Sequence, residues 1–314
     1  MSGNQNQRNA ENLKIPIWPA FYVFGVFIAF GLVFGVLQDG IGQFIFLVLV
    51  GLSVGTGFLI HARARRKRKR IGHIVSLALV GLSLFFGAGI FGRQSFQIEG
   101  FFFYVLYGVF GGVVVHYVVA KILGPIFFGR SWCTWGCWTW MVLDYLPYKN
   151  SPHQPHGHWS WLRVIHFLLS IGLVLVLFFG FGYEHGTEWK TTKGMQWFLV
   201  GNLFYYLVGV ILAVFIKDNR AFCKYFCPIT VILRACSRFS LLKVTGNQKR
   251  CVQCGACTKA CPMDINVSGY MDIGKRVLSP ECVLCQSCIV SCTTGSLGLS
   301  IGLDIGRSIP PASQ

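Results

Sequence analysis

The sequence predicts a mainly α-helical membrane bundle followed by a small cysteine-rich C-terminal domain. Of the 314 residues, 54% are hydrophobic and only 12% are charged, whereas soluble globular proteins carry roughly 25% charged residues. Six apolar segments without Asp, Glu, Lys or Arg are long enough to cross a hydrocarbon core about 30 Å thick, and in lipid such segments must be helical. The segments are Ile15–Leu37, Ile41–Ile60, Ile71–Gly92, Phe101–Ala120, Val164–Tyr183 and Met195–Ile216.

The loop between the second and third segments predicts the orientation of the bundle. It reads HARARRKRKRIGH and holds seven basic residues, and loops rich in Lys and Arg stay on the cytoplasmic side. We therefore expect a multi-pass protein of the bacterial inner membrane with its N-terminus, and everything after Lys217, in the cytoplasm. The first segment is too long for a signal-peptide core, so we expect it to be retained as an anchor. The same loop accounts for much of the net charge of +17, which argues against a nucleic-acid partner.

Eight cysteines near the C-terminus form two matching motifs, CVQCGACTKAC (Cys251–Cys261) and CVLCQSCIVSC (Cys282–Cys292). Each has the spacing C-x2-C-x2-C-x3-C, in which three cysteines hold one [4Fe-4S] cluster and the fourth reaches the other cluster. The predicted ligand sets are Cys251, Cys254, Cys257 and Cys292 for the first cluster, and Cys282, Cys285, Cys288 and Cys261 for the second. Zinc usually uses separated pairs of ligands, and disulfides are disfavoured in a reducing cytoplasm.

Together these features predict a six-helix transmembrane bundle that carries a C-terminal two-cluster α+β ferredoxin domain. The expected organisation is a tail (1–14), a membrane domain (15–216), a bridge (217–242), the ferredoxin domain (243–303) and a second tail (304–314).

Two further cysteine pairs lie at the ends of apolar segments. GRSWCTWGC (Gly129–Cys137) and NRAFCKYFC (Asn219–Cys227) align at a constant offset of 90 residues, and the surrounding segments predict an internal repeat over about 71–140 and 161–230. If each motif is helical, its two thiols lie on one face. The four cysteines, Cys133, Cys137, Cys223 and Cys227, are candidates for an additional intramembrane metal centre or for a redox-active thiol set; inert buried cysteines are the third alternative. Cys236 has no partner in this scheme, and we expect it to be a packed thiol.

The histidines and tryptophans of the membrane part give weaker indications. His116 is a candidate quinol-site residue, because ionisable groups inside membranes are often functional, although an inter-helix hydrogen bond explains it equally well. His116 and His166 are expected at different depths, which argues against a shared haem. His153, His156 and His158 are expected in a solvated turn, with metal binding as the alternative. The tryptophans at 132, 135, 138, 140, 159 and 161 are expected to form an interfacial belt.

The motifs FCKYFCP, CVQCGACTKACPMDI and CVLCQSCIVSC resemble those of the membrane-bound polyferredoxins of the NapH, NosR and CcoG type. The resemblance covers roughly the last two-thirds of the chain. It implies electron transfer between the quinone pool and a respiratory or maturation partner, whereas CcoG-like members are linked to copper reduction. The chain departs from the family pattern at Trp138 and Thr293, where proline usually follows the cysteine.

No G-x-G-x-x-G after a strand, Walker loop or C-x-x-C-H is present, so the chain lacks the usual sequence marks of a nucleotide, flavin or covalent haem site. We therefore expect a membrane relay, an electron-transfer subunit of a quinol-linked oxidoreductase, that passes electrons between quinol and a redox partner protein through two [4Fe-4S] clusters. The alternatives are a copper reductase or metalloenzyme maturation factor and, third, a membrane redox sensor.

Overall fold

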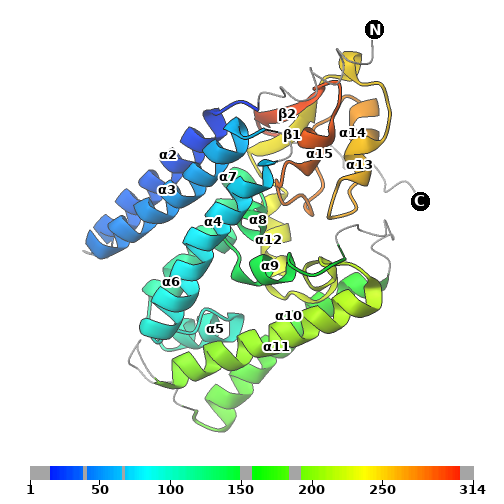
Figure 1. The fold of residues 1–314 in the computed structure, drawn as a ribbon. Coiled ribbons are helices and arrows are strands. Elements are labelled where there is room, and N and C mark those ends of the chain that lie inside the picture. The colour runs from blue at the N-terminus through cyan, green and yellow to red at the C-terminus, as the bar shows by residue number, and fades with distance from the viewer. Residues whose placement is uncertain (1–14, 38–40, 66–67, 149–157, 184–191, 305–314) are drawn as a thin grey trace.

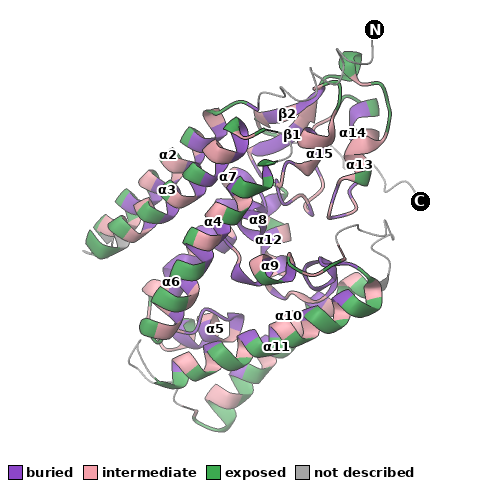
Figure 2. Ribbon diagram, viewed as in Figure 1, coloured by how far each residue is buried: buried purple, intermediate pink, exposed green. Residues whose placement is uncertain are grey.

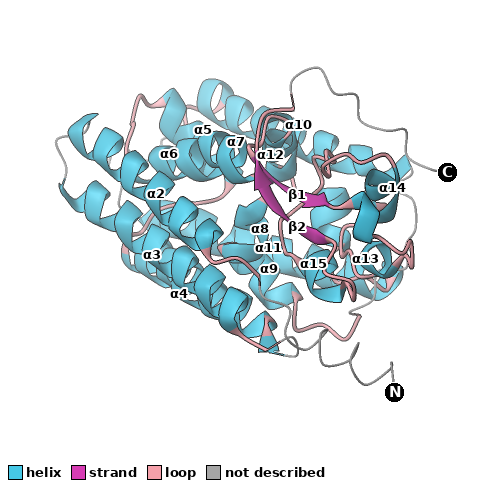
Figure 3. Ribbon diagram, turned by 90° about the horizontal axis from the view of Figure 1, so that it is seen from above, coloured by secondary structure: helices cyan, strands magenta, loops and turns pink. Residues whose placement is uncertain are grey.

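The computed structural model describes residues 15–37, 41–65, 68–148, 158–183 and 192–304, and it is mainly helical (Figures 1 and 3). Three long apolar helices come first: α2 (Trp18–Leu37), α3 (Ile41–Arg63) and α4 (Arg70–Leu82), the last extended by the π-helical η2 (Ser83–Phe91). Helix α2 packs along α3, and α3 packs along α4. The second half of the bundle contains α10 (Leu162–Leu175), which follows η4 (His158–Trp161) and continues as η5 (Val176–Gly180), and α11 (Thr192–Ile216).

Within the described residues, five helices are long and apolar enough to cross a membrane. They are Trp18–Val36, Phe44–Arg63, Arg70–Phe91, Trp159–Gly180 and Thr192–Ile216. Large apolar side chains are exposed on them, for example Phe21 on α2 and Phe215 on α11. Figure 2 shows exposed and half-buried residues along the lengths of these helices. Apolar faces of this extent require a non-aqueous surrounding, and the chain is therefore a multi-pass membrane protein.

The fourth predicted span, Phe101–Ala120, is not one continuous helix. Helix α5 (Ile98–Leu106) stops before Gly108, whose φ is +69°, and a second left-handed residue, Gly112 with φ +27°, precedes the next helical turns. Glycine adopts these angles without the steric cost that other residues pay, so the YGVFGG sequence interrupts the helix. The chain continues through α6 (Gly112–Tyr117), η3 (Val118–Leu123) and α7 (Gly124–Phe128). The expected six-helix bundle is thus not confirmed: the described part of the chain has five long spans and one shorter apolar helix, Gly112–Phe128.

Short helices follow the membrane segments at the two C-x3-C motifs. Helices α8 (Ser131–Trp135) and α9 (Trp138–Leu143) surround the first motif, and η6 (Phe222–Phe226) and α12 (Ile229–Ser237) surround the second. These elements come in the same order in the two halves of the predicted repeat. The halves differ in the preceding membrane helix, which is interrupted in the first half and continuous, as α11, in the second.

The C-terminal domain is an α+β unit closed by a two-stranded antiparallel sheet. Strands β1 (Leu242–Gly246) and β2 (Leu297–Ile301) pair with Leu242 opposite Ile301 (Figure 3). The sheet joins the two ends of the domain, so the cysteine loops between the strands are held as one unit. Between the strands lie η7 (Gln248–Arg250), α13 (Ala256–Lys259), α14 (Val267–Asp272) and α15 (Ser287–Ser291), of which α13 packs against α15.

Gly129 makes the turn that leads the chain from α7 into the first C-x3-C motif. Its φ of +57° and ψ of −148° lie in a region that is essentially restricted to glycine. A Cβ atom there would lie 3.4 Å from the Ser240 hydroxyl oxygen and 3.8 Å from the carbonyl oxygen of Cys282. The turn therefore brings the membrane part directly against the C-terminal domain.

We predict that Gly129→Ala lowers the free energy of unfolding by about 1–3 kcal/mol, the cost of a residue held in a sparsely populated backbone region. Thermal unfolding of the detergent-purified protein measures this change. The matched control is Gly25→Ala, because Gly25 is exposed on α2 and an added methyl group there would have no neighbouring atom within 4 Å; this variant should unfold at or slightly above the wild-type temperature. Equal melting of the two variants would contradict the prediction.

Candidate functional site

The eight cysteines of the C-terminal domain line two cavities in the grouping that their spacing predicts. One cavity is lined by Cys282, Cys285, Cys288 and Cys261, together with apolar side chains of the domain core. The other is lined by Cys251, Cys254, Cys257 and Cys292. Each cavity thus receives three cysteines from one motif and the distal fourth from the other.

The backbone of the two cysteine loops is shaped alike at equivalent positions. Left-handed φ angles occur at Gln253 and Gly255 in the first motif and at Leu284 and Gln286 in the second. Gln253 is equivalent to Leu284, and Gly255 to Gln286, because both pairs are 31 residues apart. Alternating right- and left-handed residues turn successive N–H groups toward one point, a geometry found at many iron–sulfur sites. Three of these four positions lack the freedom of glycine, so the loops maintain an unfavourable conformation. A set of four thiols surrounded by such loops fits a [4Fe-4S] cluster in its chemistry and in its backbone.

The two cysteine sets differ in their surroundings. Burial raises the pKa of Cys282 to about 11 and that of Cys261 to about 12, so metal binding at this set would release protons. At Cys292, burial also opposes ionisation, but hydrogen bonds lower the pKa of the thiol below its ordinary value. These bonds come from the Thr294 hydroxyl at 3.5 Å and the Ser296 amide at 3.3 Å. Thr293, which replaces the usual proline, does not prevent Cys292 from lining its cavity.

The four C-x3-C cysteines also meet in one cavity. Cys133, Cys137, Cys223 and Cys227 line an enclosed space between the halves of the bundle, together with the buried side chain of Lys121. The motifs are not the continuous helices that would place both thiols on one helix face. In each, the first cysteine lies on a helical turn and the second lies just outside it, with ψ of 117° at Cys137, the N-cap of α9, and 115° at Cys227, the C-cap of η6. Proline imposes this conformation on the residue before it at Cys227, and Cys137 adopts it although Trp138 follows.

The expectation of an interfacial tryptophan belt is wrong for four of its six members. Exposed fractions are 1–8% for Trp132, Trp135, Trp138 and Trp140. Three of them line the C-x3-C cavity, and the indole nitrogen of Trp138 donates to the amide oxygen of Asn202 at 2.7 Å. Trp159 and Trp161 are more than half exposed, as a belt position requires. The cavity walls are aromatic because the motif segments fold back into the bundle.

The first C-x3-C motif is hydrogen-bonded directly to a loop of the C-terminal domain. The Thr134 hydroxyl donates to the carbonyl oxygen of Val283 at 3.0 Å, and the Trp135 indole donates to that of Leu284 at 3.3 Å. Val283 and Leu284 separate Cys282 from Cys285. The segment between Cys133 and Cys137 therefore touches the segment between two predicted cluster ligands, with no intervening residue.

A buried ionic cluster strengthens this contact. Glu281, which directly precedes Cys282, pairs with Arg130 and lies 2.9 Å from Arg163 and 2.7 Å from Arg234. Burial alone would disfavour the charged carboxylate, but the three guanidinium groups outweigh it and lower the pKa of Glu281 to about 2. Arg130 and Arg163 are at most 2% exposed, and among the described residues their remaining guanidinium nitrogens lack hydrogen-bond partners. The ionic cluster therefore depends on the carboxylate of Glu281.

The second motif makes its own ionic contacts. Lys224 lies between Cys223 and Cys227, and its ammonium contacts Asp218 and, in the C-terminal domain, Asp264, both at 2.6 Å. Arg220, the repeat partner of Arg130, pairs with Asp144 and stacks over Trp140, 3.3 Å from the ring centre. Both motifs therefore hold charged side chains at the boundary with the C-terminal domain.

The remaining predicted residues do not meet in one site. His116 is buried between Phe96 and Trp132, with ring centres 5.2 and 5.3 Å away, in a gap of about 10 Å³. Nδ1 of His166 donates a hydrogen bond to the carbonyl oxygen of Phe226, 2.9 Å away. Cys236 lies on α12 and lines none of the three cysteine cavities. His153 and His156 fall outside the described residues.

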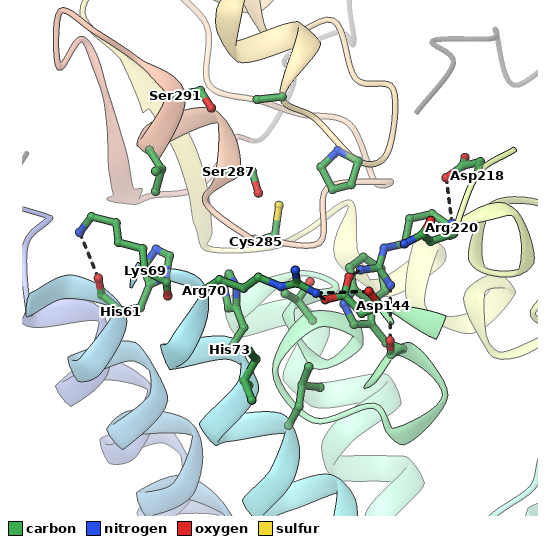
Figure 4. A pocket seen from close by; sticks show the side chains of 18 of the residues that line it. His61, Lys69, Arg70, His73, Asp144, Asp218, Arg220, Cys285, Ser287 and Ser291 are labelled. Atoms are coloured by element: carbon green, nitrogen blue, oxygen red, sulfur yellow. Dashed lines mark hydrogen bonds and ion pairs between the residues drawn. The ribbon is translucent and has the colours of Figure 1, made fainter. Parts of the chain in front are cut away.

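A further cavity, of about 410 Å³, was not predicted from the sequence. It lies between the ends of α3 and α4 and the loop that contains Cys285 (Figure 4). Its wall includes His61 and His73, whose ring centres are 4.8 Å apart. These histidines begin and end the basic stretch HARARRKRKRIGH. Its seven basic residues indicate a cytoplasmic loop and give no sign of a paired histidine site. Glu281 and Arg163 were also missed, although an acidic residue beside a cysteine motif and an arginine beside an apolar helix are visible in the sequence.

Comparison with known proteins supports this geometry. A family model described as a 4Fe-4S dicluster domain matches residues 243–293. The chain therefore carries a 4Fe-4S dicluster domain next to its membrane helices. The match confirms the expected resemblance to the membrane-bound ferredoxins at the level of the family, and it covers all eight cysteines of the two motifs.

Curated relatives match this chain over different lengths. Two uncharacterized proteins of Methanocaldococcus jannaschii are similar: MJ0749 is 32% identical over 31% of this chain and 37% of its own length, and MJ0750 is 26% identical over 63% of this chain and 82% of its own length. The putative electron transport protein YccM of Escherichia coli is 33% identical over 28% of this chain and 24% of its own length. This chain thus spans well under half the length of MJ0749 and of YccM. No solved structure matches it.

We predict that Glu281→Gln strongly destabilises the ferredoxin, because three guanidinium groups lose the charge that they share. Removing one partner of a buried ion pair costs about 3–5 kcal/mol, and thermal unfolding together with limited proteolysis near 238–242 measures the loss. Asp272→Asn is the matched control, since this carboxylate is exposed in the same domain and its loss should change stability by less than about 1 kcal/mol. Similar effects of the two substitutions would rule out a special role for the cluster.

The same carboxylate predicts a dependence on pH. Its pKa is lowered from 4.5 to about 2 in the folded protein, so its stabilising contribution is complete above about pH 4.5 and is lost as the pH falls toward 2. The difference in melting temperature between wild type and Glu281→Gln should therefore be constant above about pH 5 and shrink below about pH 4.5. A difference that grows on acidification would contradict this assignment.

Proposed function

We propose that the protein passes electrons between quinone in the bilayer and a redox partner protein, using two [4Fe-4S] clusters in its C-terminal domain. The observation that carries the proposal is the direct contact between the C-x3-C motif and the Cys282–Cys285 loop, made by Thr134 and Trp135. A membrane-embedded cysteine set and a ferredoxin loop that touch in this way form a continuous path between bilayer and solvent.

The cluster ligands are assigned from the two cavities. Cys251, Cys254, Cys257 and Cys292 would hold the first cluster, and Cys282, Cys285, Cys288 and Cys261 would hold the second. Clusters of this type, when bound, accept and donate single electrons. The first set is closer to solvent, with Cys254 exposed, and is therefore the side at which a redox partner protein would dock.

The four C-x3-C cysteines are proposed to hold an additional metal centre. They line one enclosed cavity, and four thiolates around a metal ion or cluster would carry a net negative charge that the site must balance. Lys121 in the cavity wall and Arg130 beside Cys133 supply positive charge on two sides. This arrangement favours a liganded centre over inert packing of the four thiols.

The orientation proposed from the basic loop agrees with the arrangement of the helices. The end of α3 and the start of α4 flank the basic loop, and both line the cavity that borders the C-terminal domain. Loops rich in Lys and Arg remain cytoplasmic, so the ferredoxin domain would lie in the cytoplasm of a bacterium, beneath the inner membrane.

Metal analysis of anaerobically purified protein tests these assignments. We expect about eight iron and eight acid-labile sulfide atoms from the ferredoxin domain, with about half of each lost in Cys254→Ser and in Cys285→Ser. Cys236→Ser is the control and should retain all of them. Protein that contains zinc in place of iron, without an EPR signal after dithionite, would disprove the electron-carrier function.

The additional centre has a separate test. Metal in excess of the eight irons should disappear in the double variant Cys133→Ser/Cys223→Ser, while the EPR signals of the ferredoxin clusters persist. Unchanged metal content in this variant would leave the four cysteines as redox thiols. Reduction of added Cu²⁺ that is lost in the same variant would instead favour the metal-reductase alternative.

A further inference from the structure

The cavity between α3, α4 and the ferredoxin domain has the size and position of a ligand site. Its volume of about 410 Å³ falls within the range of small-molecule pockets, roughly 300–1,000 Å³. One wall is formed by Cys285 and Ser287 of the ferredoxin, and the opposite wall by residues at the ends of two membrane helices (Figure 4). By contrast, the gap beside His116 holds about 10 Å³, which is too small for an organic ring.

The charged groups around this cavity already have partners. The Lys69 ammonium donates to the carbonyl oxygens of His61 and Ala62, at 3.0 and 3.3 Å. Arg70 and Arg220 both pair with Asp144. Each of these cations is thus already bonded to protein oxygen atoms, so an anion such as a phosphate would have to compete with Asp144 and with the two carbonyl groups.

The polar atoms that lack partners are neutral. His61 is 2% exposed, its Nδ1 lies 2.9 Å from the carbonyl oxygen of Lys69, and its Nε2 is buried without a partner among the described residues. The same holds for Nε2 of His73 and for Oδ1 of Asn219. Because a carbonyl oxygen can only accept, Nδ1 of His61 donates to Lys69, and Nε2 of the neutral ring is an acceptor. A buried polar atom without a hydrogen bond costs free energy, so a ligand with a hydroxyl group that donates to this Nε2 would be stabilised there.

The cavity also has access to lipid. Ile74 lines it and is 41% exposed on α4, and Leu77, one turn further along the same helix, continues the apolar wall into the span. A ligand with an apolar tail could therefore keep the tail in the bilayer while its polar ring occupies the cavity. A ligand that is soluble only in water would gain nothing from this wall.

The histidine pair is next to the cluster-binding loop. The Trp135 ring meets His73 and His61 edge-on, with ring centres 4.2 and 5.8 Å away, and the Trp135 indole is hydrogen-bonded to the Leu284 carbonyl beside Cys285. A ring bound at the histidines would thus be separated from the predicted second cluster by one aromatic side chain and a cysteine loop.

From these observations we infer that the cavity binds the ring of a membrane quinone in its quinol form, with His61 as acceptor of a quinol hydroxyl proton and His73 as the second hydrogen-bonding partner. The inference rests on the proposed function and places its quinone site at the ferredoxin boundary instead of at His116. A quinone ring is neutral, carries oxygen atoms on opposite edges and bears an apolar tail, which matches the partners, the charge and the lipid access of the cavity.

The test uses a short-tailed azidoquinone photolabel on the full-length protein in lipid nanodiscs, with adducts mapped by mass spectrometry. We expect adducts on segments 61–77 and 285–291. Labelling should fall about tenfold in His61→Gln and His73→Gln, the effect of losing roughly one hydrogen bond. Ile74→Trp should block the site sterically, whereas Ile71→Trp should not, since Ile71 is equally exposed on α4 (43% against 41%) but does not line the cavity.

Two outcomes overturn the inference: labelling that resists all three cavity substitutions, or labelling that His116→Gln abolishes while His61→Gln and His73→Gln do not. Dithionite-reduced EPR spectra of the same samples report whether each variant is folded and carries its clusters. Intact clusters without labelling of the cavity would disprove only the quinone site, whereas absent clusters in the wild type would disprove the proposed function itself.

Discussion

The structure depends on one buried carboxylate. Glu281 is held by Arg130 from the turn after α7, Arg163 from the start of α10 and Arg234 from α12. Three separate elements of the membrane part thus converge on a single side chain of the ferredoxin domain. Because Glu281 directly precedes Cys282, the same contact fixes the position of a predicted cluster loop relative to the bundle. Without a fixed position, the loop and the C-x3-C motif could not remain hydrogen-bonded.

The ionic cluster also has an electrostatic consequence. Arg130 and Arg163 are buried beside Glu281, and Arg234 reaches it from a partly exposed position, so one carboxylate faces three guanidinium groups and positive charge is in excess. Burying unbalanced charge is costly unless a compensating charge lies close by. Cysteine-bound metal centres carry net negative charge, and both the Cys282 set and the C-x3-C set lie beside Arg130. The boundary is therefore suited to hold such centres on either side of it, and the excess charge would stabilise their reduced forms.

The two halves of the predicted repeat make different contacts at this boundary. Arg130 and Arg220 occupy equivalent positions, yet Arg130 docks the ferredoxin through Glu281 and Arg220 is turned toward Asp144 and Trp140. The space that Arg220 borders is the cavity with His61 and His73. Arg130 thus holds the C-terminal domain, whereas Arg220 borders a cavity that Cys285 also lines.

The sequence by itself determined the membrane character, the dicluster domain and the grouping of its cysteines, because these depend on composition and on local spacing. It also identified the four C-x3-C cysteines, whose repetition at an offset of 90 residues is visible without a structure. It misjudged Phe101–Ala120, where Gly108 and Gly112 outweigh the apolar character of the segment, and it placed Trp132 to Trp140 at the lipid interface when they are buried. Only the tertiary structure decided that Glu281 meets three arginines and that His61 meets His73. The first contact joins residues from distant parts of the chain, the second depends on how α3 and α4 pack against each other, and no local pattern encodes either.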